Sequence, residues 1–468
     1  MIYNSIAVSL CLIFNKETTA IELHFSNIRS LKMQESRSKT NESQRETGSN
    51  KEEISSRTKI MAIVTLAFFL DTMLFSVIVP IIPDILHNLD VSDTKTIQGE
   101  ISDESVKIGI LLASKAVVQL LVNPCIGYLS GRVGYKTPLL SGFLILCVST
   151  LAFAIESSYA FLFFARAFQG IGSACVSVSG LAVLAQSFPD YDERTKAMGI
   201  ALTVGWAFGI TFAPTFGGFM YEFVGKSSAF LVLALIAFIG IILQMCITYP
   251  AVNHTRKQSS SLFHLLQDPC ILTAAGSIMV SNIVYGMLDT CIPIIVKERM
   301  ELDSAQTGAS FLPCSLFYMI GTFSFGRIAS CIGRWLTCIL GLFLMGSASV
   351  SFMFIYKPEV LIIPMALTGL AIGMVDASMF PELGNLADLR HTVTYGVVYS
   401  IGDISVCLGL AVGPAMSGWL IDRIGFNWMV VVTSITCLVY APLLFIIKKP
   451  KPRTHEDENE NTLLSTHP

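Results

Sequence analysis

Charged residues are scarce in this chain. Asp, Glu, Lys and Arg make up 14% of its 468 residues, whereas 53% are hydrophobic. A soluble globular domain carries about 25% charged residues, so this composition, with a mean hydropathy of +0.63, excludes an ordinary soluble protein and indicates a polytopic membrane protein. The formal net charge is only −3, so the chain also lacks the basic field that a nucleic-acid partner requires.

The chain lacks the sequence motifs of catalysis as well. It has twelve cysteines, but they form no CxxC pair and no Cys/His cluster. Eleven of them lie within or beside apolar spans, where cysteine serves as a small buried hydrophobe. No nucleophile motif and no phosphate-binding motif occurs. We therefore expect a protein that is not an enzyme and that has no cofactor and no metal site.

Twelve apolar spans occupy most of the chain instead. At about 1.5 Å per residue, a helix of about twenty residues crosses a hydrocarbon core of about 30 Å. We predict an all-α polytopic membrane protein with twelve transmembrane helices in two parallel six-helix repeats. The spans are expected near residues 60–86, 107–128, 138–155, 159–187, 196–221, 228–249, 270–296, 305–328, 335–356, 359–383, 394–420 and 427–447.

The two halves share motifs at a nearly constant offset. Parallel repeats of this kind place a substrate site at their interface, near the middle of the membrane. Prolines inside the first repeated motif, Pro214 and Pro414, break the helical hydrogen-bond ladder, so we expect them to let two helices bend during gating. The repeated pairs are Gly209–Gly218 with Gly409–Gly418, Tyr221–Gly225 with Ile421–Gly425, and Gly127–Gly134 with Gly326–Arg334.

Polar stretches mark the predicted domain boundaries. Residues 1–58 end in a run of Ser, Lys, Glu, Asn and Arg that cannot bury enough surface to fold, which predicts a disordered tail. Residues 251–267 are predicted to link a bundle over 59–250 to a bundle over 268–447, and residues 448–468 form a second tail. One set of loops and tail ends holds fifteen Lys and Arg against seven in the opposite set, which predicts cytosolic tails and a cytosolic linker.

Ionisable residues inside the spans are the main candidates for a functional site. Asp71 lies in the middle of the apolar run Met61–Pro83. A carboxylate at that depth costs several kcal/mol unless it meets a cation, a proton or a polar cavity, and the alternative is an Asp that only locks helix packing. Such groups can hold protons in one conformation and release them in another. The other members of the set are Lys115, Arg166, Asp289, Asp376 and Asp403.

Long sequence strings resemble one membrane-protein family. They include LDTMLFSVIVPIIP, LLASKAVVQLLVNP, AIGMVDASMFP and LADLRHTVTYGVVYSIGD. Over residues 60–447 the chain resembles the major facilitator superfamily and, within it, the vesicular amine transporters. The GRW string at 333–335 and GMVDASM are more similar to the monoamine branch, whereas LLVNP is more similar to the acetylcholine branch.

The resemblance implies the major facilitator fold and a specific activity. The expected protein is a proton-coupled antiporter that loads a cationic amine neurotransmitter into acidic secretory or synaptic vesicles by alternating access. Its partners would be the amine, protons and the lipid bilayer. A vesicular acetylcholine or polyamine transporter of the same fold is the alternative. From other classes, an amine-gated channel or a receptor is the rival interpretation.

The resemblance also implies roles for individual residues. Lys115 is expected to pair with Asp403 and with Asp71, Asp289 to meet the ammonium group, and Asp376 to couple protons. Arg166 is left open, because it could line the pocket or act as a structural charge partner of Asp376 or Asp289. The other residues implied at the substrate pocket or gate are Thr72, Asn282, Tyr318, Tyr399 and Phe311.

The chain departs from the family pattern at several of these positions. Thr72 stands where the family usually has Asn, and Asp289 stands where it has Glu. Leu112, Ile295 and Leu410 replace aromatic residues. Fewer aromatic rings provide fewer cation–π contacts, so the sequence predicts an amine selectivity that differs from that of typical monoamine transporters.

The last residues of the chain resemble a sorting signal. An acidic cluster precedes Leu463-Leu464, as in dileucine signals that bind sorting adaptors. The acid expected four residues before the first leucine is replaced by Asn459. The alternative is an ordinary solvated tail.

Overall fold

The computed structural model describes residues 55–78, 100–155, 158–225, 227–247, 262–300, 309–391 and 395–448. In these ranges the chain is helical apart from short turns. Contacts divide the chain into two units, 1–58 and 59–468. The predicted tails over 1–54 and 449–468 and most of the predicted linker lie outside the described residues, and the division into two six-helix domains stays a prediction.

The helices follow the apolar spans closely. The first helix is Ser55–Ser76. It is followed by α3 (Glu100–Val133), α4 (Lys136–Ile155), α5 (Tyr159–Ser187), α6 (Tyr191–Ile200), the π-helix η1 (Ala201–Ala207), α7 (Phe208–Phe223), α8 (Ser228–Cys246), α9 (Leu262–Leu266), α10 (Pro269–Met300), α12 (Leu312–Ile332), α13 (Arg334–Ser351), η2 (Phe352–Phe354), α14 (Pro358–Arg390), α15 (Tyr395–Tyr440) and η3 (Ala441–Lys448).

Eleven helices in the described ranges are long and apolar enough to cross a membrane. The remaining predicted span, 107–128, lies within α3, which has 34 residues but carries Lys115 and two amides in its apolar run. Several predicted boundaries are wrong. The first helix begins at Ser55, inside the predicted tail over 1–58, α3 begins at Glu100 rather than at residue 107, and α12 begins at Leu312 rather than at residue 305. The first helix ends at Ser76 rather than at residue 86, and α14 continues to Arg390 rather than ending at residue 383, because its polar last turns are bound by neighbouring helices.

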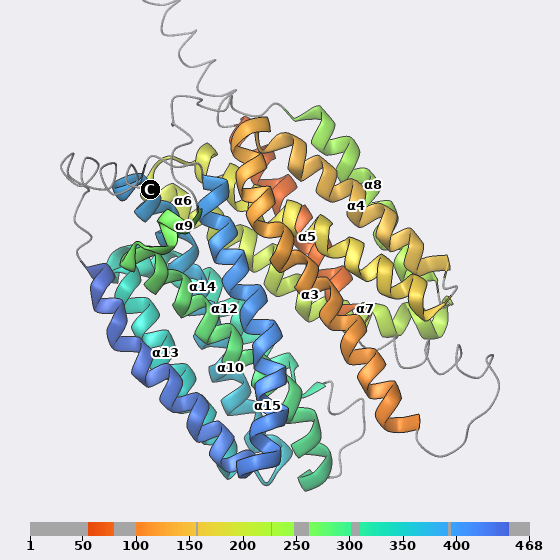
Figure 1. The fold of residues 1–468 in the computed structure, drawn as a ribbon, viewed down its shortest axis with the longest axis vertical. Coiled ribbons are helices and arrows are strands. Elements are labelled where there is room, and N and C mark those ends of the chain that lie inside the picture. Colours follow the sequence, from red (N-terminus) through yellow and green to blue (C-terminus); the bar gives the residue numbers. More distant parts are fainter. Residues whose placement is uncertain are drawn as a thin grey trace, which may run out of the picture. The chain divides into compact units, whose positions relative to one another are not determined.

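Within residues 59–468 the helices form two groups of neighbours (Figure 1). In the first group α5 packs against α3 and α4, and α4 packs against α8. In the second, α14 packs against α12 and α13, and α10 packs against α15. We call residues 59–247 the N-terminal helices and residues 262–448 the C-terminal helices. The two sets meet where α15 contacts α3 and α5, and where α6 and η1 contact α12.

The backbone repeats where the sequence repeats. The described glycines with positive φ are Gly134, Gly225, Gly333 and Gly425, with φ of 89°, 134°, 98° and 81°. They form two pairs with the offsets of the sequence repeat. Gly425 separates two helices within α15, and Gly134 and Gly333 lie directly before α4 and α13. A side chain is strained at positive φ, so each of these turns requires glycine.

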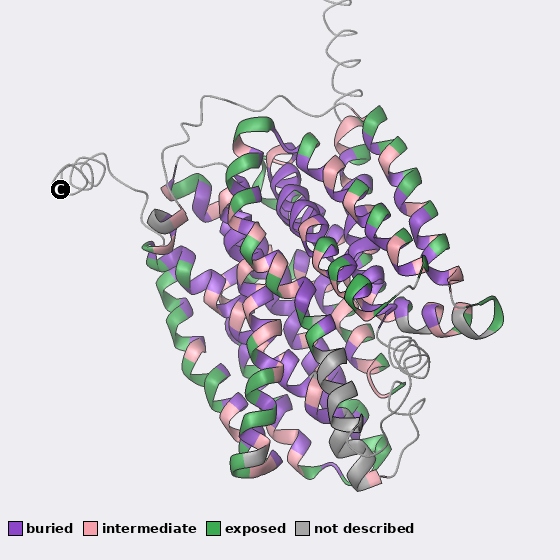
Figure 2. Ribbon diagram, turned by 45° about the vertical axis from the view of Figure 1, so that its right-hand side comes forward, coloured by how far each residue is buried: buried purple, intermediate pink, exposed green. Residues whose placement is uncertain are grey.

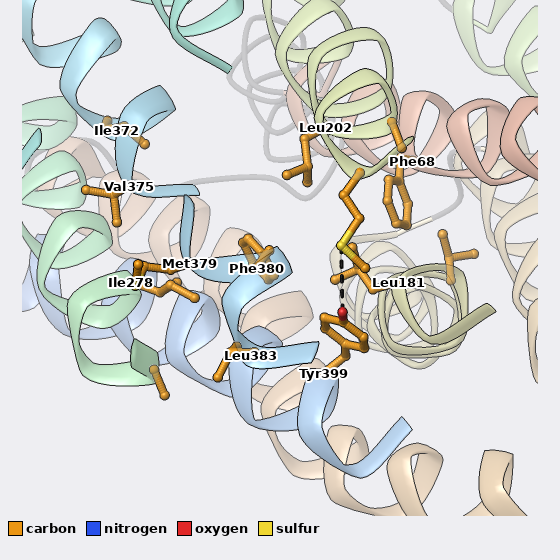
Figure 3. Packing of buried hydrophobic residues seen from close by; sticks show 14 of the residues in the cluster. Phe68, Leu181, Leu202, Ile278, Ile372, Val375, Met379, Phe380, Leu383 and Tyr399 are labelled. Carbon is orange, nitrogen blue, oxygen red and sulfur yellow. Dashed lines mark hydrogen bonds between the residues drawn. The ribbon is translucent and has the colours of Figure 1, made fainter. Parts of the chain in front are cut away.

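Burial separates an inner surface from an outer one (Figure 2). Large apolar side chains such as Leu121, Phe164, Trp419 and Trp428 are more than 60% exposed. So many exposed apolar groups are typical of a surface that contacts lipid. Inside, one hydrophobic cluster includes Phe68 and residues of α5, η1, α14 and α15 (Figure 3). The core is therefore continuous between the N-terminal and the C-terminal helices.

A candidate substrate and proton site

Asp71 forms an ion pair in the middle of the bundle. The Lys115 Nζ lies 3.0 Å from Asp71 Oδ1, and the two side chains are 5% and 7% exposed. The Ser173 hydroxyl donates to the same carboxylate oxygen. The first helix, α3 and α5 thus meet at one carboxylate. A buried charge is tolerated when it is paired and hydrogen-bonded, and both conditions hold for Asp71.

Arg166 binds the end of the first helix. Its guanidinium donates to the carbonyl oxygens of Leu74 at 3.1 Å and Phe75 at 3.2 Å, and to Gln169 Oε1 at 2.7 Å. The last carbonyls of a helix have no partner within the helix, and a cation there also interacts favourably with the helix dipole. Arg166 is fully buried. Among the described residues it forms no ion pair with Asp376, and the Asp289 side chain lies outside the description.

One aromatic ring lies close to both buried cations. Lys115 Nζ is 5.0 Å and the Arg166 guanidinium carbon 5.4 Å from the centre of the Phe75 ring. A ring face attracts cations most strongly when water is excluded. Phe75 therefore helps to hold two positive charges near Asp71. The sequence interpretation did not identify this residue.

The predicted ion pair between Lys115 and Asp403 does not form. Asp403 accepts a hydrogen bond from Gln119 Nε2 at 2.8 Å instead. Gln119 lies four residues after Lys115, so both side chains project from one face of α3, one turn apart. In this arrangement Lys115 reaches Asp71, and Gln119 reaches Asp403. One turn further, Asn123 Nδ2 lies 3.9 Å from the Cys407 sulfur.

Asp376 has a neutral partner as well. The Tyr318 hydroxyl donates to Asp376 Oδ2 at 3.0 Å. The other oxygen, Oδ1, is buried and has no hydrogen-bond partner among the described residues. The Tyr318 hydroxyl thus joins α12 to Asp376 on α14, and its predicted place in the substrate pocket stays a prediction. A carboxylate with one free buried oxygen can accept a proton without losing an existing bond.

The hydroxyl of Thr72 and the amide of Asn282 bind backbone rather than other site residues. Thr72 donates to carbonyl oxygens of its own helix and to the Gly205 oxygen at 3.0 Å. Asn282 donates to the Ile278 oxygen within α10 at 2.8 Å. Asp289 lies on the same helix, and its side chain is outside the described residues.

Tyr399 lies apart from Asp71. Its hydroxyl contacts the Met198 sulfur at 3.6 Å (Figure 3), and the ring is fully buried. Its neighbours include Gly384 and Arg194. Tyr399 therefore joins α15 to α6 rather than lining the Asp71 network. Of the predicted gate residues, Phe311 is a half-buried residue at the start of α12, Pro414 lies within α15, and Pro214 lies within α7 with its side chain outside the description.

A dense polar network closes one end of the bundle around Arg194 and Arg334. We call this the basic end. Arg194 is 2.8 Å from the Asp388 carboxylate and donates to the Tyr395 hydroxyl at 3.2 Å. These bonds join α6 of the N-terminal helices to α14 and α15 of the C-terminal helices.

Arg334 extends the same network. It is 3.2 Å from Glu382 Oε2, and its Nη2 donates to the Tyr191 carbonyl oxygen at 3.2 Å and to the Thr195 hydroxyl. Its guanidinium carbon also lies 3.6 Å from the centre of the Tyr191 ring. Arg334 is 2% exposed. The sequence analysis counted both arginines among the residues of the inter-helix loops, and the structure shows that both are buried.

Asp268 connects α10 to the end of α14. Its carboxylate is 2.7 Å from Arg390 Nε and 2.7 Å from His391 Nε2, and it accepts from the Cys270 N–H at 2.9 Å. Burial opposes the charge of this carboxylate, but the hydrogen bonds from His391, Arg390 and the Cys270 backbone outweigh it and hold the pKa of Asp268 well below its usual range. His391 thus has a structural partner at its turn.

Several partners in the site escaped the sequence interpretation. Gln119 and Asn123 follow Lys115 at intervals of four, a polar stripe visible in LLASKAVVQLLVNP. That spacing could have revealed a shared helix face. Ser173 and Phe75 have no such signal, because single Ser and Phe residues are common in membrane helices. In the described part of the chain no group of three His, Cys, Asp or Glu side chains could hold a metal ion.

Comparison with known proteins gives consistent results. The Major Facilitator Superfamily profile matches residues 64–408. The human chromaffin granule amine transporter is 45% identical over 353 residues, covering 75% of this chain and 67% of that protein. A probable vesicular acetylcholine transporter of Danio rerio is 36% identical over 418 residues, covering 86% and 81%.

A solved structure shows the same fold. The human organic anion transporter MFSD10 aligns with a TM-score of 0.71 at 16% identity, covering 83% of this chain and 99% of that one. At this identity the likeness concerns the fold alone. It matches the all-helical arrangement described above.

Proposed function

Because the chain belongs to the major facilitator superfamily and its relatives include vesicular amine transporters, we propose that it is a proton-coupled antiporter that loads a cationic amine into acidic secretory or synaptic vesicles. The family consists of transporters rather than enzymes. Alternating access between two sides of the membrane is the corresponding mechanism. The amine and the protons are the proposed substrates.

The Asp71–Lys115 pair is the observation that carries this proposal. Removing one partner of a buried ion pair leaves an uncompensated charge. The ammonium of an amine has the same charge as the Lys115 ammonium, so it can replace Lys115 at Asp71 without leaving the carboxylate unpaired. In a site from which water is excluded, the negative charge of Asp71 stays compensated only if one cation replaces another.

The remaining carboxylates supply the proton half of the exchange. Asp403 is bound by the amide of Gln119, and Asp376 by the hydroxyl of Tyr318. Neither has a cationic side chain in contact among the described residues. A proton can neutralise each of them in place. Lys115 is one helical turn from Gln119, so when an amine displaces it from Asp71, Asp403 is the carboxylate within reach, and a proton on Asp403 would be released.

The basic end supplies the barrier that alternating access requires. Bonds join α6 to the C-terminal helices at this end, so in the proposed mechanism the amine reaches the central site from the opposite side. The excess of Lys and Arg places the basic end, and with it both termini, in the cytosol. The arrangement is then the one that faces the vesicle lumen. Localisation in secretory or synaptic vesicles, and sorting through Leu463-Leu464, belong to the same proposal.

The choice between amines rests on one side chain of α15 and on the similarity to relatives. An acetylcholine or polyamine transporter is the second candidate, because Leu410 of α15 is aliphatic where the family has an aromatic residue. The chain is nevertheless less similar to the acetylcholine transporter than to the amine transporter. We therefore favour a monoamine substrate.

Uptake into acidified vesicles tests the proposal. Purified protein in liposomes with an acid interior should accumulate a labelled monoamine, and collapse of the pH gradient should release it. External unlabelled amine should accelerate efflux of labelled amine, as expected for a carrier. Flux without exchange would indicate a channel, absence of any flux would indicate a receptor, and uptake of choline esters or polyamines alone would select the second candidate.

A further inference from the structure

A π-helix interrupts the helix formed by α6, η1 and α7. The Phe208 N–H points to the Thr203 carbonyl, five residues earlier, and also to the Gly205 carbonyl. An α-helix would pair Phe208 with the residue four positions before it. Segments of π-helix are rare, and they are frequent at functional sites. Such a segment needs other contacts to hold it in place.

The first helix supplies one of those contacts through Thr72. The Thr72 hydroxyl lies 3.0 Å from the Gly205 carbonyl oxygen and 2.8 Å from the carbonyl oxygen of Phe68 in its own helix. A Cβ atom at Gly205 would come within 2.5 Å of Phe68 Cβ, and one at Gly209 would overlap the Thr72 hydroxyl. Glycine at these two positions is what allows the first helix to reach η1.

On its other side η1 contacts the C-terminal helices. The Thr203 hydroxyl donates to the Thr322 hydroxyl at 2.7 Å, and each of the two residues is at most 5% exposed. The Trp206 ring packs edge-on against the Phe380 ring of α14, with 5.5 Å between the ring centres. It packs in a tilted arrangement against the Phe68 ring, with 5.4 Å between the ring centres. The π-helix therefore lies between helices that must move relative to each other if the basic end opens.

We propose that Thr72 is a positioning residue that fastens η1 to the first helix in the conformation closed at the basic end, and that its hydroxyl does not bind the amine. Release of the Gly205 carbonyl lets η1 return to α-helical pairing when α6 separates from α12. The role in transport rests on the proposed function, whereas the contact itself does not.

The Thr72 hydroxyl can make this exchange at little cost. Its single hydrogen can turn from the Gly205 carbonyl to the Phe68 carbonyl, which also lies within hydrogen-bond distance, so the donor is never left unsatisfied. The loss of one π-helical insertion shifts the residues on one side by about one position, or about 1.5 Å along the axis.

Trp206 provides a direct probe of η1. The chain has four Trp residues, and the other three can be replaced with Trp335→Phe, Trp419→Phe and Trp428→Phe. In this background Thr72→Val removes the hydroxyl at nearly constant volume, and Thr72→Ser retains it. Thr65→Val is the matched control, because the Thr65 hydroxyl binds only the Met61 carbonyl of its own helix among the described contacts.

The emission of Trp206 is measured on purified protein without amine and without a pH gradient. We expect Thr72→Val to shift it, and Thr72→Ser and Thr65→Val to leave it unchanged. In liposomes, Thr72→Val should change the maximal uptake rate by about 2- to 12-fold, the value of one net hydrogen bond, while KM stays within about twofold. A raised KM with unchanged emission would show that Thr72 binds the amine and would overturn the proposal.

Two further outcomes are decisive. Should Thr72→Val fail to fold, Thr72→Ala removes the same donor, and faster amide hydrogen exchange over residues 201–208 is expected; unchanged exchange overturns the proposal. The experiment distinguishes failure of the proposed function from failure of this proposal. If the parent protein shows no uptake, the proposed function fails, and the Trp206 emission of the variants can still be compared. If the parent shows uptake but Thr72→Val and Thr72→Ser have equal emission, only the proposed role of Thr72 is wrong.

Discussion

The centre of the bundle and its basic end both bury charged side chains, but they satisfy them differently. At the centre, the partners of Asp403 are the side-chain amides of Gln119 and Asn123, and Asp376 has one phenol partner and one oxygen without any among the described residues. At the basic end, Arg334 is bound by a carboxylate, a carbonyl, a hydroxyl and an aromatic ring. Charged side chains thus lie in a sparse network at the centre and in a denser one at the basic end, where Arg334 Nε alone of that guanidinium has no hydrogen-bond partner among the described residues.

This difference in bonding matches two different roles, the exchange of protons and cations at the centre and the closure of the bundle at the basic end. A dense buried network rigidifies the helices it joins, because several groups would lose partners on movement. A sparsely bonded carboxylate can take a proton or a cation without first breaking several contacts. The centre is therefore suited to exchanging partners, and the basic end to holding the N-terminal and C-terminal helices together.

The strongest way to break this comparison is to remove the charge of Asp71. Asp71→Asn leaves the shape but removes the group that pairs with Lys115 and, by our proposal, with the amine. We expect uptake to fall by at least about 100-fold, as for loss of a buried charge partner of about 3–5 kcal/mol. Asp190→Asn, at the exposed start of α6, is the control. Normal uptake by Asp71→Asn at equal protein levels would contradict the assignment.

A double substitution distinguishes the observed pair from the one predicted from sequence. Lys115→Met alone leaves the Asp71 carboxylate charged and without its cation. Asp71→Asn alone leaves the Lys115 ammonium charged and without its carboxylate. Combining them should restore much of the roughly 3–5 kcal/mol lost by each single variant, measured as the melting temperature of the purified protein. Lys115→Met with Asp403→Asn should show no such recovery. Recovery in that second pair would instead support a direct contact of Lys115 with Asp403.

At the basic end, Arg334→Gln tests the denser network. The change leaves the Glu382 carboxylate buried without its cation, so we expect a loss of about 3–5 kcal/mol in stability. The control Arg327→Gln alters an exposed arginine of α12 and should leave the melting temperature unchanged. Because the proposed barrier lies here, residual Arg334→Gln protein should also leak protons faster. Equal melting temperatures for the two variants would remove the contrast between centre and end.

Asp268 offers a smaller test with a defined pH dependence. Asp268→Asn keeps the oxygen that accepts from the Cys270 N–H but loses the charge, so we expect a cost of about 1–3 kcal/mol. The pKa of Asp268 lies below its unfolded value, so its contribution is complete above about pH 4 and is lost only as pH falls through the lowered pKa. The stability difference between wild type and Asp268→Asn should therefore not shrink between pH 8 and pH 5. A difference that vanished by pH 5 would contradict the lowered pKa.

The sequence predicted the helices and the buried charges, but only part of their pairing. Apolar runs and repeated glycines determine spans and turns locally, which is why Gly134 and Gly333 have the same conformation. Pairing depends on the rotation of neighbouring helices. Lys115 and Gln119 share one face of α3, so a shift by one turn along the helix axis decides which of them reaches Asp403, and composition does not encode this shift. The partners of Arg194 and Arg334 were not predicted for a related reason, since a basic residue beside a turn is solvated unless helices from the other half cover it.

The smallest expected effect concerns selectivity at the centre, where sparse bonding should make substitutions tolerable. Asp reaches about 1.5 Å less far than Glu, so an ammonium held by Asp289 must lie closer to α10. Leu410 is half-buried on α15 and offers apolar area without the ring that attracts a cation. Each cation–π contact of about 0.5–2 kcal/mol corresponds to roughly 2- to 30-fold in affinity.

Asp289→Glu with Leu410→Tyr should therefore lower the inhibition constants of aromatic amines in the uptake assay by that factor, while constants for aliphatic amines change less. Leu410→Met adds volume without a ring and serves as the control. Unchanged constants for aromatic amines in the double variant would show that these two positions do not determine selectivity in this transporter.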